Sequence, residues 1–137
     1  MEKFSCLIIE ENTKDVLQLS EILNSFKYLE IIGNTENVKE GLNLLNTLEP
    51  QILFLNFQLN NTNKSQLLEK VKKQPTIFFI IDDDHETKKN FELNGFKYIV
   101  KPYHQTQIKQ ALDSIMQTHN QLATKMQSLL GKLKFED

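Results

Sequence analysis

Short apolar runs alternate along the chain with longer stretches in which apolar residues recur at helical spacing. A short, continuously apolar run predicts a buried strand, whereas recurrence at about every third or fourth position predicts an amphipathic helix. The predicted strands span residues 4–9, 29–33, 51–55, 76–81 and 96–100. A helix is predicted after each strand, and the last one begins near residue 104. Strands and helices that alternate on short connections indicate a parallel sheet covered by helices on both faces.

The polarity of the runs predicts the order of the strands in this sheet. Runs 51–55 and 76–81 are apolar throughout, so both strands should be central and buried on both faces. Run 29–33 is half polar and suits an edge. We therefore expect an α/β, flavodoxin-like, doubly wound five-stranded parallel sheet in the order 2-1-3-4-5, with an extended C-terminal helix. That order places the carboxyl ends of the first, third, fourth and fifth strands around one crevice.

Polar residues at the predicted helix starts supply capping signals. Asn12 or Thr13 can cap the first helix, and Asp15 adds negative charge to its first turn, where the helix dipole favours it. Asp83 and Glu86 have the spacing of a capping box, which predicts that the acidic cluster after the fourth strand caps the fourth helix. A cation site formed by that cluster is the alternative.

Composition narrows the classes of function. A length of 137 residues fits one domain with a core of its own. The net charge of -2 offers no broad basic field, so we expect no nucleic-acid binding through this segment. Cys6 lies in an apolar run and is expected to be a buried, inert thiol. The first apolar run is too short for a signal sequence or a membrane span, so we expect a cytoplasmic chain with no membrane partner.

A specific set of residues follows the strands at the predicted crevice. They are Glu10 and Glu11 after the first strand, Asn56 after the third, Ile81 at the end of the fourth, and Lys101 with Pro102 after the fifth. Together with the turn at 56–59 and the segment 91–95, these residues make the chain resemble the receiver domain of bacterial two-component response regulators over about residues 4–118. Each motif is weak alone, whereas the whole set in this order is specific.

The resemblance implies a role for each of these positions. In the family, an acidic pair and an aspartate bind a divalent cation, the aspartate takes a phosphoryl group from a histidine kinase, and a hydroxyl residue and a lysine hold the phosphoryl oxygens. The chain keeps the acidic pair as Glu10 and Glu11, the lysine as Lys101 and the aromatic switch position as Tyr98. It departs at the acceptor aspartate, which is Asn56, at the hydroxyl residue, which is Ile81, and at a loop proline, which is Asn60.

These departures predict a degenerate pseudo-receiver that lacks the phosphoacceptor aspartate. A neutral amide forms no acyl phosphate, so Asn56 cannot be the acceptor, and Ile81 offers no donor to a phosphoryl oxygen. Mg²⁺ prefers several anionic oxygens, so we expect no metal and no other cofactor, with Glu10 and Glu11 only as weakened candidate ligands. In a pocket without a cation, Lys101 is expected to pair with Glu10 or Glu11.

We therefore expect a module of signal transduction with no catalytic residues and no enzymatic activity. It would act by protein–protein contact, with a histidine kinase or an output domain as partner. The alternative is a phosphoaccepting receiver that binds Mg²⁺ and has Asp at position 56 in the native gene. An isolated substitution would leave the rest of the pocket intact, whereas Ile81 and Asn60 depart as well. A flavodoxin-like cofactor binder is disfavoured because no glycine-rich phosphate loop follows the first strand.

The last predicted helix carries a regular apolar seam. Its residues are Ile108, Leu112, Ile115, His119, Leu122, Met126, Leu129 and Leu133. This period of about 3.5 is typical of helices that pair with another helix. We therefore expect a receiver-like domain over 1–118 and a coiled-coil extension over 119–137 that makes a homodimer, with His119 as a polar seam residue. Pairing with another protein's helix, or folding back on the chain's own domain, are the alternatives.

Overall fold

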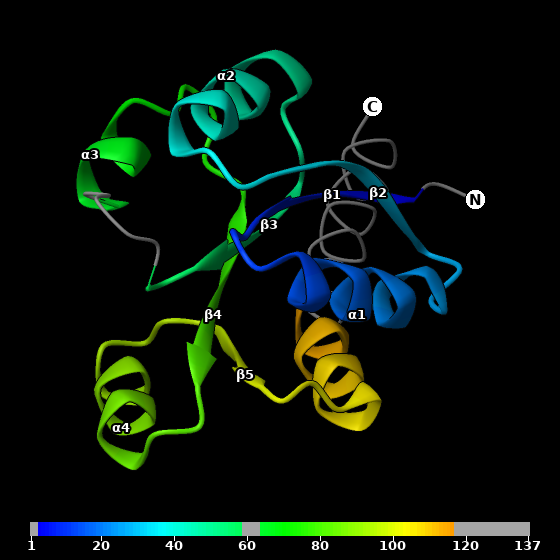
Figure 1. Ribbon diagram of the computed structural model, residues 1–137, viewed down its shortest axis with the longest axis vertical. Coiled ribbons are helices and arrows are strands. Elements are labelled where there is room, and N and C mark those ends of the chain that lie inside the picture. Colours follow the sequence, from blue (N-terminus) through cyan, green and yellow to red (C-terminus); the bar gives the residue numbers. More distant parts are fainter. Residues whose placement is uncertain (1–2, 59–63, 117–137) are drawn as a thin grey trace, which may run out of the picture. The chain divides into compact units, whose positions relative to one another are not determined.

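The computed structural model describes residues 3–58 and 64–116. Within these residues the strands are β1 (Phe4–Ile9), β2 (Leu29–Thr35), β3 (Ile52–Asn56), β4 (Thr76–Asp82) and β5 (Tyr98–Lys101). They form one five-stranded sheet in the order β2-β1-β3-β4-β5, and every neighbouring pair is parallel (Figure 1). The predicted fold class and strand order are confirmed, including the edge position of β2.

Four labelled helices connect the described strands. They are α1 (Thr13–Asn24), α2 (Val38–Leu48), α3 (Lys64–Glu69) and α4 (His85–Leu93). Figure 1 shows α1 on the opposite side of the sheet from α2 and α3. The chain divides into a unit over residues 1–103, which contains the whole sheet, and a unit over 104–137, in which residues 105–116 are helical.

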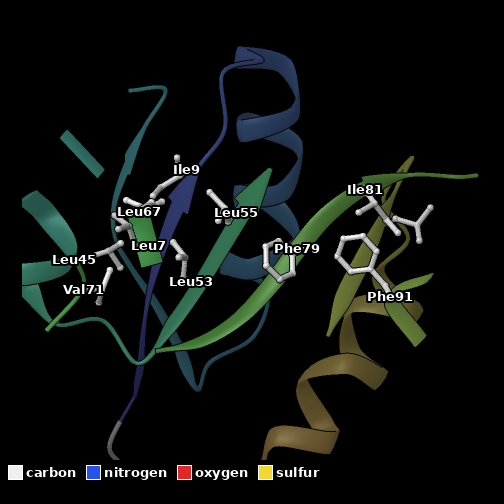
Figure 2. Packing of buried hydrophobic residues seen from close by; sticks show 11 residues of the cluster. Leu7, Ile9, Leu45, Leu53, Leu55, Leu67, Val71, Phe79, Ile81 and Phe91 are labelled. Carbon is white, nitrogen blue, oxygen red and sulfur yellow. The ribbon is translucent and has the colours of Figure 1, made fainter. Parts of the chain in front are cut away.

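Side chains that alternate along the strands build the core. One face of the sheet contributes Leu7, Ile9, Leu53, Leu55, Phe79 and Ile81, which cluster with Leu45 from α2, Leu67 and Val71 from α3 and the segment after it, and Phe91 from α4 (Figure 2). Intervening residues point to the other face because successive side chains of a strand alternate. There the rings of Phe54 and Phe78 stack with centroids 5.5 Å apart. Both faces of β3 are therefore buried, as its continuous apolar run predicts.

Helix starts and ends agree with the sequence in part. Asn12 caps α1, since its Oδ1 accepts the Asp15 N–H at 3.1 Å. The cap of α4 is Asp84, whose Oδ2 accepts the Thr87 N–H and hydroxyl at 3.2 and 2.6 Å, so the prediction of Asp83 as the cap was wrong by one residue. The cause is local, because the carboxylate of Asp83 pairs instead with Lys88 at 2.6 Å.

The structure also bears on membrane insertion. Within residues 3–58 and 64–116, every helix falls short of the length and apolarity that a membrane crossing requires.

Candidate functional site

The carboxyl edge of the sheet collects the polar residues that follow the strands. Glu10 comes directly after β1, Asn56 is the last residue of β3, and Lys101 is the last residue of β5. The Glu10 N–H donates to the Thr35 carbonyl at 3.0 Å, which ties the end of β1 to the end of β2. Parallel strands end at the same edge, so the fold brings together residues that are far apart in the sequence.

Lys101 is held between two carboxylates. Its Nζ lies 2.5 Å from Glu10 Oε1 and 2.6 Å from Asp15 Oδ2. The Glu10 side chain is fully buried, whereas the side chains of Lys101 and Asp15 are 20% and 23% exposed. The ammonium therefore lies between a buried carboxylate and a partly exposed one. The expected pairing of Lys101 with Glu10 is present, whereas Glu11 is exposed.

The pKa values of the pair move for different reasons. Burial acts to lower the pKa of Lys101, but its hydrogen bonds to Asp15 and Glu10, together with their charges, raise it. Burial raises the pKa of Glu10, and the ammonium of Lys101 offsets that effect only in part. The pKa of Lys101 rises because its ammonium binds two carboxylates. The pKa of Glu10 rises because its side chain is fully buried and shares a single ammonium with Asp15.

Asn56 is buried beside this group, with 8% of its surface exposed. Its Oδ1 accepts the Gln58 N–H at 2.9 Å, and the following Phe57 N–H donates to the Ile80 carbonyl at 3.0 Å. The Asn56 amide lies near enough to Glu10 to lower the pKa of that carboxyl, yet Glu10 Oε2 has no partner at hydrogen-bond distance in the described chain. The amide therefore acts on Glu10 weakly.

Ile81 does not join the polar group. Its side chain is 1% exposed and belongs to the core cluster with Phe79 and Phe91 (Figure 2). An aliphatic side chain provides neither a donor nor an acceptor. The fold thus places an apolar contact at the end of β4 where the family pattern has a hydroxyl.

Tyr98 is half-buried at the start of β5 and is tied to α4. Its hydroxyl donates to Glu92 Oε1 at 2.6 Å, and its ring meets Phe91 edge-on with centroids 6.1 Å apart. The hydrogen bond to Glu92, followed by burial, raises the pKa of Tyr98 to about 12. This hydrogen bond holds the Tyr98 hydroxyl against α4. The orientation of the Tyr98 side chain therefore depends on Glu92.

The donors near Lys101 form a poor set for a hard divalent cation. Residues 3–58 and 64–116 contain no cluster of three or more histidine, cysteine or acidic side chains suited to a metal. The two carboxylates that face the pocket, Glu10 and Asp15, are both bound to the Lys101 ammonium, and Asn56 adds only a neutral amide. Mg²⁺ prefers several anionic oxygens in near-octahedral geometry.

Sequence reasoning missed two residues at this site. Asp15 was expected only to favour the helix dipole, although the first turn of a helix that starts at the same sheet edge was a signal that it lies nearby. Tyr103 was not singled out; its hydroxyl is buried without a hydrogen-bond partner in the part of the chain that the structure describes. Burial, and then the charges of Glu10 and Asp15, raise the pKa of Tyr103.

Comparison with known proteins places this geometry in a family. Residues 6–113 match the model of the response regulator receiver domain. The chain belongs to this family. The resemblance inferred from the strand-end residues is thereby confirmed at the level of the family: the chain is a receiver domain of the response regulators.

Two curated relatives are transcriptional and sensory regulators. The receiver is 35% identical over 115 residues to the transcriptional regulatory protein LytR of Staphylococcus aureus, a match that covers 82% of this chain and 47% of the relative. It is 31% identical over 123 residues to the sensory transduction protein LytT of Bacillus cereus, with 87% and 50% covered. The chain thus spans about half the length of the curated relatives it matches.

A solved structure supports the same fold. The response regulatory domain of protein mrkE from Klebsiella pneumoniae has a TM-score of 0.69 with this receiver at 24% sequence identity, and the match covers 86% of this chain and 99% of that one. At this identity the likeness concerns the fold alone.

Proposed function

We propose that this receiver domain signals by protein contact and takes no phosphoryl group. The observation that carries the proposal is the amide at position 56. Asn56 is the last residue of β3 and lies near Glu10, at the position that the resemblance assigns to the acceptor aspartate. Formation of an acyl phosphate needs a carboxylate oxygen that attacks phosphorus and becomes part of a mixed anhydride, whereas the Asn56 amide oxygen is neutral and already accepts the Gln58 N–H.

The remaining parts of the pocket support the same proposal. A phosphoryl group on the end of β3 would need donors for its oxygens, and Ile81 supplies none. Lys101 forms ion pairs with Glu10 and Asp15, and both pairs lie within the domain. We propose further that the pocket works without Mg²⁺, because both of its carboxylates already bind the Lys101 ammonium and Asn56 supplies no anionic oxygen.

A phosphoryl mimic tests the proposal without a kinase. Beryllofluoride with Mg²⁺ binds a carboxylate at the acceptor position, so the backbone amide NMR signals of Gln58, Tyr98 and Lys101 should not shift in the wild-type chain. Asn56→Gln keeps an amide at this position and controls for effects of the salts elsewhere; it should respond as the wild type does. Saturable shifts at these three residues in the chain with Asn56, but not in Asn56→Gln, would contradict the proposal.

The contact surface that we propose is the C-terminal helix. Of its seam residues, Ile108 and Leu112 are buried, with 0% and 2% of their surface exposed, and Ile115 is partly exposed. His119, Leu122, Met126 and Leu129 lie outside the described residues. The proposed contact surface therefore begins at Ile115. A seam of period about 3.5 favours a homodimer. The proposed division into a domain over 1–118 and a coiled-coil extension over 119–137 rests on the same pattern, and a histidine kinase or an output domain is the proposed heterologous partner.

Solution mass tests the homodimer. Light scattering should give a dimer for the chain of 137 residues and a monomer for a variant that ends at residue 118. A monomer in both cases would contradict the homodimer, and a dimer in both would place the interface in the receiver instead of the extension. Neither result bears on phosphorylation, so the two halves of the proposal are tested separately.

A further inference from the structure

Asp15 approaches Lys101 from the partly exposed side of the pocket. Its Oδ2 lies 2.6 Å from the Lys101 ammonium, and its side chain is 23% exposed, whereas Glu10 on the same ammonium is fully buried. The backbone of Asp15 is held at the start of α1, because the Asn12 side chain accepts its N–H at 3.1 Å. Asp15 therefore lies on the side from which a solvent-borne anion would reach Lys101.

The Lys101 ammonium already binds two carboxylates. Glu10 and Asp15 carry two negative charges against the one positive charge of Lys101, so the group is net negative when all three are ionised. An incoming phosphoryl oxygen would have to displace Asp15 from the ammonium or bind close to its carboxylate. Both routes are unfavourable, because like charges at short range repel and the carboxylate gives up a charge-assisted hydrogen bond.

We propose that Asp15 is a positioning residue that acts as a built-in anion, holding Lys101 so that the pocket excludes a phosphoryl group even when a carboxylate stands at position 56. The inference rests on the proposed function and deepens it, because it assigns part of the block to a residue outside the family pattern. Position 15 is not among the strand-end residues that carry the resemblance, and its side chain reaches the pocket only because α1 starts at the same edge of the sheet.

The consequence concerns reversal of the degenerate pocket. Restoring the acceptor with Asn56→Asp alone should leave phosphorylation slow, because Lys101 stays engaged by Asp15. Adding Asp15→Asn removes the competing charge while keeping the size of the side chain and the Asn12 cap, which binds only the backbone of residue 15. The double variant should therefore accept a phosphoryl group faster than the single variant.

The experiment measures adduct formation by intact mass with phosphoramidate as donor and Mg²⁺ present. In this reaction a carboxylate oxygen at position 56 forms a bond to phosphorus, the nitrogen–phosphorus bond breaks, and ammonia leaves with the bonding electron pair and a proton. Asn56→Asp with Asp15→Asn should react at least about tenfold faster than Asn56→Asp, a fraction of what one oxyanion donor typically contributes. Asn56→Asp with Glu21→Gln is the matched control, because Glu21 is an exposed carboxylate of the same helix; it should react like the single variant.

Every outcome of this experiment is decisive. Equal rates for the single and double variants would overturn the inference, and so would a double variant that forms no adduct, because Asp15 would then not be what excludes the phosphoryl group. An adduct on the wild-type chain would instead overturn the proposed function, which separates the two failures. Urea unfolding of each variant shows whether it is folded before rates are compared.

A second measurement separates positioning of Lys101 from a general effect on the fold. Side-chain ¹⁵N NMR of lysine, assigned with Lys101→Arg, should show that Asp15→Asn lowers the pKa of Lys101 in the wild-type background. Asp15→Glu should keep it raised, and Glu21→Gln should leave it unchanged. A pKa of Lys101 that does not respond to Asp15→Asn would show that the two side chains are not coupled in solution.

Discussion

The Lys101 ammonium lies 2.5 Å from Glu10 Oε1, although 91 positions separate the two residues in the sequence. The contact depends on the parallel sheet, which ends β1 and β5 at the same edge on either side of Asn56. Glu10 is fully buried, so the ammonium is the principal compensation for its charge. Removing the ammonium would therefore leave a buried charge without its main partner, which should lower the free energy of unfolding.

Lys101→Met should strongly destabilise the domain. It leaves the Glu10 carboxylate buried and uncompensated, and breaking a buried pair from one side typically costs about 3 kcal/mol or more. Urea unfolding at pH 7 measures the change. Lys109→Met is the matched control, because Lys109 and Asp113 form a pair that is 60% and 44% exposed; its effect should stay within about 0.5 kcal/mol. Similar losses for both variants would contradict the account.

Glu10→Gln should behave differently and should depend on pH. Burial raises the pKa of Glu10 above its usual value of 4.5, so the folded state binds a proton more tightly than the unfolded state does. The stability of the wild type relative to Glu10→Gln is then highest below about pH 4.5 and falls as the pH rises through the raised folded-state value. Urea unfolding of both proteins from about pH 5 to about pH 8 tests this dependence. A relative stability that rises with pH would contradict the raised pKa.

Gly41 in α2 sets how closely the helix approaches β1. A Cβ at this position would lie 2.6 Å from Cδ1 and 3.2 Å from Cγ1 of Ile9, which is fully buried. Gly41→Ala should therefore destabilise by about 1 kcal/mol, since overpacking of 1–3 kcal/mol exceeds the roughly 1 kcal/mol gained in helix propensity.

Ile9→Val removes the crowding atom and provides the control for this substitution. In the Ile9→Val background, Gly41→Ala should be neutral or stabilising, because the helix propensity of alanine is no longer opposed by the contact with Cδ1. A double-mutant cycle from thermal or urea unfolding measures the coupling. Strict additivity of the two substitutions would show that Ile9 does not limit the approach of α2.

The bond between Tyr98 and Glu92 predicts a shifted titration. Glu92→Gln removes the anionic acceptor at 2.6 Å, so the pKa of Tyr98 should fall from about 12 toward its usual value of 10.0. The stability that this bond contributes is fully present below pH 10.0 and is lost as the pH rises through about 12. The ¹³Cζ NMR signal of Tyr98 reports the titration. Glu86→Gln, also in α4, should leave it unchanged, and an equal shift in both variants would exclude a specific contact.

Much of the fold was accessible from the sequence because its signals are local and repeated. The continuous apolar runs of β3 and β4 required burial on both faces, and the half-polar run of β2 required an edge. Boundaries were less accurate. The apolar spacing predicts a third helix over about residues 64–73, whereas α3 ends at Glu69, and β5 begins at Tyr98 instead of residue 96. Propensity does not decide such ends, because hydrogen bonds of the final turn do.

The candidate site was predicted where strand order alone positions residues. Glu10, Asn56 and Lys101 end parallel strands, so topology brings them together without knowledge of side-chain geometry. Asp15 and the split between Glu10 and Glu11 were not predictable in this way. Which of two adjacent acids turns inward, and whether a first-turn carboxylate of α1 reaches Lys101, depend on side-chain directions within a few ångströms.

The most direct test of the account is the mass of the wild-type chain after incubation with phosphoramidate and Mg²⁺. The account predicts the unmodified mass at every time point, because Asn56 offers no carboxylate to phosphorus and Lys101 is engaged by Glu10 and Asp15. An added mass of one phosphoryl group that hydroxylamine removes would show an acyl phosphate on this chain and would contradict the central claim.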